Sequence, residues 1–194
     1  MKTNTKKIVG TGLFTAIVVV LQLVASAIKF GPFSITLVLA PIIIGAAMYG
    51  IGAGAWLGFA FGVTVLISGD AAAFLTINPA GTVITVLLKG TLAGLAAAAV
   101  FKALKNVNTL LAVILAGIAC PLVNTGIFLI GCRLFFYSTI QQWAAGMGIE
   151  NAAVYMITVL VGVNFIIELL VNLVLSSAIV KIIDIGIKKN KIHA

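Results

Sequence analysis

The sequence predicts an all-α membrane protein with six transmembrane helices in one compact bundle. Three observations lead to this fold class. Of the 194 residues, 62% are hydrophobic and only 8% are charged, whereas about a quarter of a soluble domain is charged. The mean hydropathy is +1.28. Six apolar runs are candidates for crossing a bilayer, which takes about 20 residues. We therefore expect residues 1–194 to form a single membrane domain.

The six predicted helices follow one another with short polar breaks. They are placed at residues 8–28, 33–49, 50–68, 80–104, 109–137 and 152–183. The first apolar run is too long for a signal peptide, so we expect it to be retained. Pro41 is expected to kink the second helix, and Pro121 lies inside the fifth. Residues 70–79, in which Asp70 could be a loop or cap residue, and residues 138–151 are expected to form loops.

Glycines repeat along the third predicted helix. Gly50, Gly54, Gly58 and Gly62 recur at every fourth position, so on an α-helix they form one ridge without side chains. Small residues let helices approach each other closely in lipid, where apolar burial alone gives no preference. We expect this glycine ridge to pack against a neighbouring helix.

The lysines indicate how the helices are oriented. Most of them lie in the N-terminal segment, in the 105–108 region and in the C-terminal segment. With six spans these three regions share one side, and the positive-inside rule makes that side cytoplasmic. The sequence therefore predicts a multi-pass protein of a prokaryotic plasma membrane with both termini in the cytoplasm.

Polar groups interrupt the last three apolar runs at bilayer depth. Each ionisable group there costs about 2.5–3.5 kcal/mol on insertion scales, so each is a candidate functional residue. Asn164, Glu168 and Asn172 are spaced i, i+4 and i+8, which places them on one helix face. If the three helices surround a common cavity, the polar groups converge on it. With two residues of the 70–79 loop, the predicted substrate-binding residues are Lys89, Asn124, Arg133, Asn164, Glu168, Asp70 and Asn78.

Most of these residues also have a structural interpretation. Lys89 and Glu168 could simply neutralise each other as an embedded pair. Arg133 lies near the outer end of its helix and could extend to the headgroups. Asn124 and Asn172 could form hydrogen bonds between helices. These structural roles and the binding roles both remain open at the level of the sequence.

Several catalytic motifs are absent from the sequence. It has no Walker-type loop for ATP hydrolysis, no HExxH or GxSxG motif and no cysteine and histidine cluster. We therefore expect no enzymatic activity, no metal site and no cofactor.

The chain resembles the substrate-binding S components of energy-coupling factor (ECF) vitamin transporters over nearly its whole length. The resemblance rests on its size, on six helices, and on a basic start followed by GLFTA at residues 12–16. It also rests on a short second helix before the glycine-rich third, on LLKG at 87–90 followed by Gly94, and on Asn164 in a long final helix. It implies a substrate-binding subunit of an ABC transporter, not an enzyme, which captures a water-soluble vitamin or related metabolite from the outer face.

The resemblance also implies partners and residue roles. The partners are a membrane coupling (T) subunit and two cytoplasmic ATPases that drive uptake, and Gly12 and Ala16 match the small residues that dock on the coupling subunit. Residues 30–34 would form a lid over the site, and Asn164 would touch the ligand. Riboflavin-binding members tend to have a lysine near the position of Glu168, which argues against riboflavin here.

Charge suggests a ligand type, and other functions compete with the S component. Lys89 and Arg133 would suit a carboxylate-bearing vitamin such as pantothenate. A stand-alone secondary or proton-coupled transporter would use Glu168 as its proton site, although no inverted repeat is evident. A membrane enzyme lacks a nucleophile or metal set. A purely structural subunit would leave the embedded charges without a role beyond pairing.

Overall fold

The computed structural model describes residues 3–27, 29–30, 33–34 and 38–192, and most of them are helical. The chain begins with α1 (Thr3–Ala27), a short antiparallel pair of β1 (Lys29–Phe30) and β2 (Phe33–Ser34), and α2 (Leu39–Tyr49). It continues with α3 (Ile51–Ile67), α4 (Ala72–Leu75), α5 (Pro79–Leu104), α6 (Thr109–Phe135) and α7 (Tyr137–Gly146). The last elements are α8 (Ala152–Tyr155), the π-helix η1 (Met156–Gly162) and α9 (Val163–Ile192).

Among the described residues, four helical segments are long and apolar enough to cross a membrane: Thr5–Ala27, Pro79–Leu104, Thr109–Phe135 and Ala152–Ile185. Two shorter apolar helices, α2 and α3, accompany them. Large aliphatic side chains lie exposed on the outer surfaces of the long helices, which is the arrangement that a lipid solvent favours. The structure thus confirms a mainly helical membrane protein.

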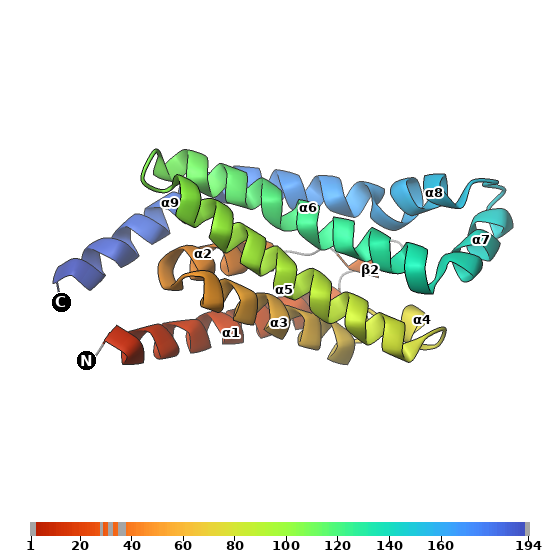
Figure 1. Cartoon of the computed structure of the whole chain (residues 1–194), viewed down its shortest axis with the longest axis horizontal. Helices are drawn as coiled ribbons and strands as arrows, with labels where there is room; N and C mark the ends of the chain where they lie inside the picture. The colour runs from red at the N-terminus through yellow and green to blue at the C-terminus, as the bar shows by residue number, and fades with distance from the viewer. Residues whose placement is uncertain (1–2, 28, 31–32, 35–37, 193–194) are drawn as a thin grey trace.

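Figure 1 shows how the helices lie along one another in an elongated bundle. The described chain begins and ends at the same end of the bundle, while α4 and α7 lie at the opposite end. Helices α3 and α6 run toward the α4 end, and α5 and α9 run back. The closest packing along the bundle joins α5 to both α3 and α6.

The second helix is shorter than the sequence predicts. The expected helix covers residues 33–49, but Phe33 and Ser34 form strand β2, and the helix begins only at Leu39. Pro41 therefore lies in the first turn of α2, where a missing N–H costs nothing, and it does not kink the helix. All residues of α2 from Leu39 to Ala46 are buried, and α2 packs against α1, α3, α5 and α9. A helix of 11 residues is only about 16 Å long, so α2 is a core helix.

Two predicted loops contain helices. The 70–79 segment includes the short α4, and the 138–151 segment is largely α7. Helix α7 is amphipathic, with Ile140 and Ala144 buried and its glutamines exposed. Glutamines and serine beside an aromatic residue suggest a loop in the sequence, but the apolar residues at i and i+4 face the bundle.

Of the four regularly spaced glycines, Gly54, Gly58 and Gly62 form the predicted glycine ridge. A Cβ atom on Gly54 or Gly58 would overlap the backbone of Gly94 or Gly90 on α5, and one on Gly62 would come within 2.8 Å of the Val86 carbonyl oxygen. The two backbones are therefore in direct contact, as small residues permit in lipid. Gly50 differs, because it lies at the junction of α2 and α3 with φ of +92° and a Cβ there would meet nothing within 4 Å. Its role is in the turn and not in packing.

The last helical segment is continuous but irregular. The sequence predicts one regular helix over 152–183, but seven residues, Met156–Gly162, adopt π-helical geometry. A π-helical turn shifts the register of the side chains that follow it, and such turns are frequent at functional sites. Here the π-helix directly precedes Asn164 and Glu168, so it sets the direction in which α9 presents both residues.

Candidate functional site

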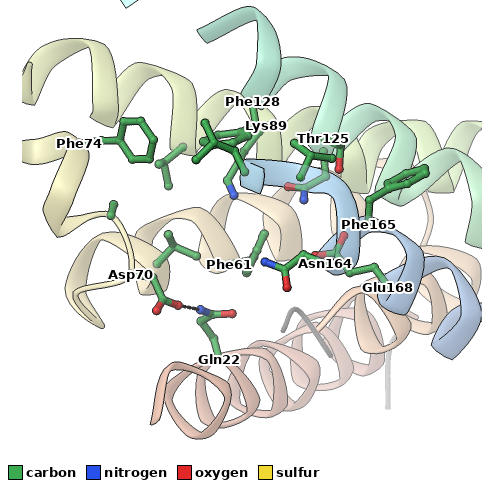
Figure 2. A pocket seen from close by; sticks show the side chains of 16 residues that line it. Gln22, Phe61, Asp70, Phe74, Lys89, Thr125, Phe128, Asn164, Phe165 and Glu168 are labelled. Carbon is green, nitrogen blue, oxygen red and sulfur yellow. Dashed lines mark hydrogen bonds between the residues drawn. The ribbon is translucent and has the colours of Figure 1, made fainter. Parts of the chain in front are cut away.

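A partly open cavity of about 700 Å³, its mouth included, lies among the helices toward the α4 end of the bundle. Residues from α1, α3, the α3–α4 turn, α4, α5, α6, η1 and α9 line it. Figure 2 shows the polar and aromatic side chains around this space. The polar lining residues are Gln22, Asp70, Lys89, Asn124, Thr125, Asn164 and Glu168. A cavity with a mixed apolar and polar lining and several convergent polar groups has the character of a small-molecule site.

Lys89 supplies a positive charge to the cavity from the middle of α5. Its Nζ atom lies 5.6 Å from the ring centroid of Phe61 and 5.5 Å from that of Phe128. Both distances are within the range of a cation–π interaction. The carboxylates of Glu168 and Asp70 also attract its charge electrostatically. Rings and carboxylates together hold the ammonium group at the cavity, where Figure 2 shows it pointing inward.

A hydrogen bond joins α1 to the turn that follows α3. The Gln22 side-chain Nε2 donates to Asp70 Oδ2 over 2.6 Å, and Figure 2 shows this bond at one side of the cavity. Gln22 is only 2% exposed although it lies in an apolar helix. Because buried polar groups need partners, the bond fixes both side chains in the wall of the cavity.

Asn124, Asn164 and Glu168 complete the polar wall from α6 and α9. Asn124 and Glu168 are each 5% exposed. Asn172 shares the helix face of Asn164 and Glu168, but it lies one further turn away and its Nδ2 donates to the Gly117 carbonyl oxygen over 3.3 Å. The predicted polar face of the last helix therefore divides into two cavity residues and one residue that binds the neighbouring helix.

Aromatic side chains close the α4 end of the cavity. The ring of Phe74 lies 5.7 Å from that of Phe128, 4.8 Å from that of Phe136 and 5.8 Å from that of Trp143. These contacts connect α4 with α6 and α7, and edge-to-face aromatic pairs of this kind contribute beyond simple burial. The ring contact between Phe74 and Trp143 thus joins α7 to the cavity wall, which Phe74 lines.

The structure brings five of the seven predicted binding residues to one cavity and leaves two outside it. Lys89, Asn124, Asn164, Glu168 and Asp70 line it. The Arg133 guanidinium is exposed and stacks at 3.9 Å from the Tyr137 ring centroid. Asn78 caps α5, because its Oδ1 accepts a hydrogen bond from the Gly81 backbone N–H at 2.9 Å.

Sequence reasoning missed Gln22, Thr125 and the cavity phenylalanines. Gln22 had a signal, since it is an amide within a long apolar run of α1. The phenylalanines gave no such signal, because the sequence does not distinguish an aromatic residue that faces lipid from one that faces the core or a ligand. Residues 30–34, the predicted lid, lie partly outside the described residues.

An exposed groove runs along α1 and α3, near the end that holds the termini. It is lined by Lys7, Ile8, Thr11, Gly12, Gly52, Ala53 and Trp56. A Cβ atom on Gly12 would meet nothing within 4 Å, and Ala16 is also exposed. The Trp56 Nε1 donates to Thr15 Oγ1 over 3.1 Å, which connects the two helices beside the groove.

A comparison with protein families decides the class of this protein. A family model described as the ECF transporter, substrate-specific component, matches residues 6–180. The chain belongs to this family. A comparison with curated proteins and one with solved structures gave no match. Membership confirms the resemblance drawn from the sequence, and it makes this S component a substrate-specific subunit of an ECF transporter.

Proposed function

We propose that this S component captures a water-soluble vitamin or related metabolite in the cavity around Lys89, for ATP-driven uptake. The observation that carries the proposal is the convergence of seven polar side chains, five of them predicted from the sequence, on one partly open cavity between α1, α3, α5, α6 and α9. Ionisable side chains are costly in the membrane and are retained where they serve a site. The sequence predicts a carboxylate-bearing ligand from Lys89 and Arg133 together. Of these two residues, only Lys89 lines the cavity.

The orientation proposed from the lysines fits the placement of the cavity. Both ends of the described chain lie at one end of the bundle and the cavity lies toward the other. If the lysine-rich termini and the α5–α6 turn are cytoplasmic, the α4 and α7 end faces outward and α4 and α7 border the entrance. The six passes proposed from the sequence would then have to include the two shorter apolar helices, α2 and α3, with α2 buried in the core of the bundle.

Family membership implies a membrane coupling subunit and ATPases as partners, and we propose that α1 docks on the coupling subunit through Gly12 and Ala16. Both residues are accessible at the surface of α1, and small residues permit close helix contact in lipid. Gly12→Leu is expected to fold and bind ligand but to abolish co-purification with the coupling subunit. Ala99→Leu is the matched control, since Ala99 is exposed on α5. Equal loss of co-purification in both variants would contradict this docking site.

A stand-alone transporter is the competing proposal, and reconstitution separates the two. Proteoliposomes are prepared with this S component alone or with its coupling subunit and ATPases, and uptake of the ligand is followed with and without internal ATP. We expect uptake only with the full complex and ATP. Uptake by the isolated chain that a proton gradient drives and Glu168→Gln abolishes would establish the carrier and overturn the proposal.

Two asparagines on α9 offer a sharp test of the binding wall. Asn164→Ala is expected to weaken ligand binding about 2- to 12-fold, because a neutral hydrogen bond contributes about 0.5–1.5 kcal/mol. Asn172→Ala, two turns further along, is expected to lower the melting temperature through loss of its bond to Gly117 while leaving the dissociation constant unchanged. Isothermal titration and thermal unfolding measure both. Equal effects of the two substitutions on binding would remove Asn164 from the site.

A further inference from the structure

We propose that the ligand is an overall neutral or positively charged compound, rich in hydrogen-bond donors, with a flat apolar part. The inference rests on the proposed function, because it concerns the ligand of that same cavity. It replaces the carboxylate-bearing vitamin predicted from the sequence. Three properties of the described lining carry it: the balance of charges, two buried acceptor atoms, and the aromatic walls.

The charged groups among the described lining residues are one lysine and two carboxylates. Lys89 faces Glu168 and Asp70, and both act electrostatically on its ammonium group. Arg133, the second cation that the sequence assigned to a carboxylate ligand, stacks on Tyr137 outside the cavity. An anionic ligand would therefore bring a further negative group to a site where Lys89 is already opposed by two, and juxtaposed like charges disfavour binding. A neutral or cationic ligand avoids this repulsion.

Two buried amide oxygens of the lining have no hydrogen-bond partner within the described part of the chain. They are Gln22 Oε1 and Asn124 Oδ1. Gln22 already uses its Nε2 on Asp70, so its remaining atom can only accept. Buried polar atoms in native proteins are nearly always satisfied by protein, water or ligand. A ligand with N–H or O–H groups would satisfy both oxygens and could also donate to the carboxylates.

The remaining lining is apolar, with four phenylalanines among aliphatic side chains. Phe61 and Phe128 flank the Lys89 ammonium group, and Phe74 and Phe165 line the cavity beside them. A flat apolar ring would pack on these faces, as aromatic pairs do in protein cores. Lys89 can then donate to one acceptor atom of the ligand. An amino- or amide-substituted heterocycle combines these features.

Charge-based fractionation of a compound mixture tests the inference. A bacterial small-molecule extract is separated at neutral pH on an anion exchanger into a bound, anionic fraction and a flow-through of neutral and cationic compounds. The purified full-length protein is then melted with each fraction. We expect stabilisation by the flow-through. Stabilisation only by the bound fraction would overturn the inference and leave the proposed function standing, and stabilisation by neither would overturn both.

A variant of the wall adds a second readout. Glu168→Gln keeps the size of the side chain and removes one negative charge, so about tenfold more of the flow-through fraction should be needed for half-maximal stabilisation, since bonds to charged groups are the stronger ones. Asp184→Asn is the matched control, because Asp184 is exposed on the same helix and does not line the cavity. An unchanged or lower requirement in Glu168→Gln would contradict the inference.

Discussion

Replacing Gly58 with alanine is expected to lower the free energy of unfolding by about 1–3 kcal/mol, the usual cost of overpacking a tight contact. The added methyl group would overlap the carbonyl oxygen and carbon of Gly90, which are backbone atoms and cannot rotate away. Helices α3 and α5 must then separate, and the contacts at Gly54 and Gly62 are weakened with them. Thermal unfolding of the purified protein measures the effect as a loss of several degrees.

Gly52→Ala is the control for this prediction. Gly52 lies on the same helix, but a methyl group there would meet nothing within 4 Å. Alanine favours a helix over glycine by about 0.5–1 kcal/mol, so this variant should be slightly more stable than the parent. The two substitutions are chemically identical and should have opposite signs. Destabilisation by Gly52→Ala, or none by Gly58→Ala, would show that the glycine ridge is not the packing contact.

Replacing Lys89 with methionine is expected to abolish ligand binding and to lower the free energy of unfolding by about 3 kcal/mol. This is the lower end of the range for breaking a buried charge pair, because the cavity is partly open. The substitution leaves the embedded Glu168 and Asp70 without the cation that attracts them. Titration with ligand and thermal unfolding give the two quantities. Lys102→Met, an exposed lysine in the last turn of α5, is the control and should change neither.

The double variant Lys89→Met/Glu168→Met separates a structural pair from a binding site. Replacing both charges with apolar side chains often restores stability that a single replacement removes. We expect the double variant to be more stable than Lys89→Met and still unable to bind ligand. If the double variant regained binding, the two charges would serve only each other.

Much of the fold could be predicted because membrane helices leave strong signals. Long apolar runs and the glycine spacing place α3, α5 and α6 within two residues of their observed ends. The start of α2 is misplaced because residues 33–38 are almost as apolar as the helix that follows. Helix α7 is not predicted because polar residues dominate its composition. The π-helix is not predicted because its sequence is as apolar as that of an ordinary transmembrane helix.

The candidate site could be predicted only where a residue is unusual for its surroundings. Lys89 and Glu168 are conspicuous because a charge in the membrane is costly. Arg133 is equally conspicuous, but the rotation of α6 directs it to Tyr137 instead of the cavity. The rotation of a helix about its own axis depends on its packing against helices that are distant in the sequence. It cannot be inferred from a single sequence. The same limit applies to the phenylalanines of the cavity wall.

Ligand-dependent stabilisation of the purified protein tests the central claim most directly. The full-length S component is melted in detergent with a panel of water-soluble vitamins and nucleobase-type compounds, alongside Lys89→Met. A ligand that binds only the folded state at one hundred times its dissociation constant adds about 2.7 kcal/mol of stability. We predict a clear increase in melting temperature with one compound, absent in Lys89→Met. An equal increase in Lys89→Met would contradict the assignment of the binding site to this cavity.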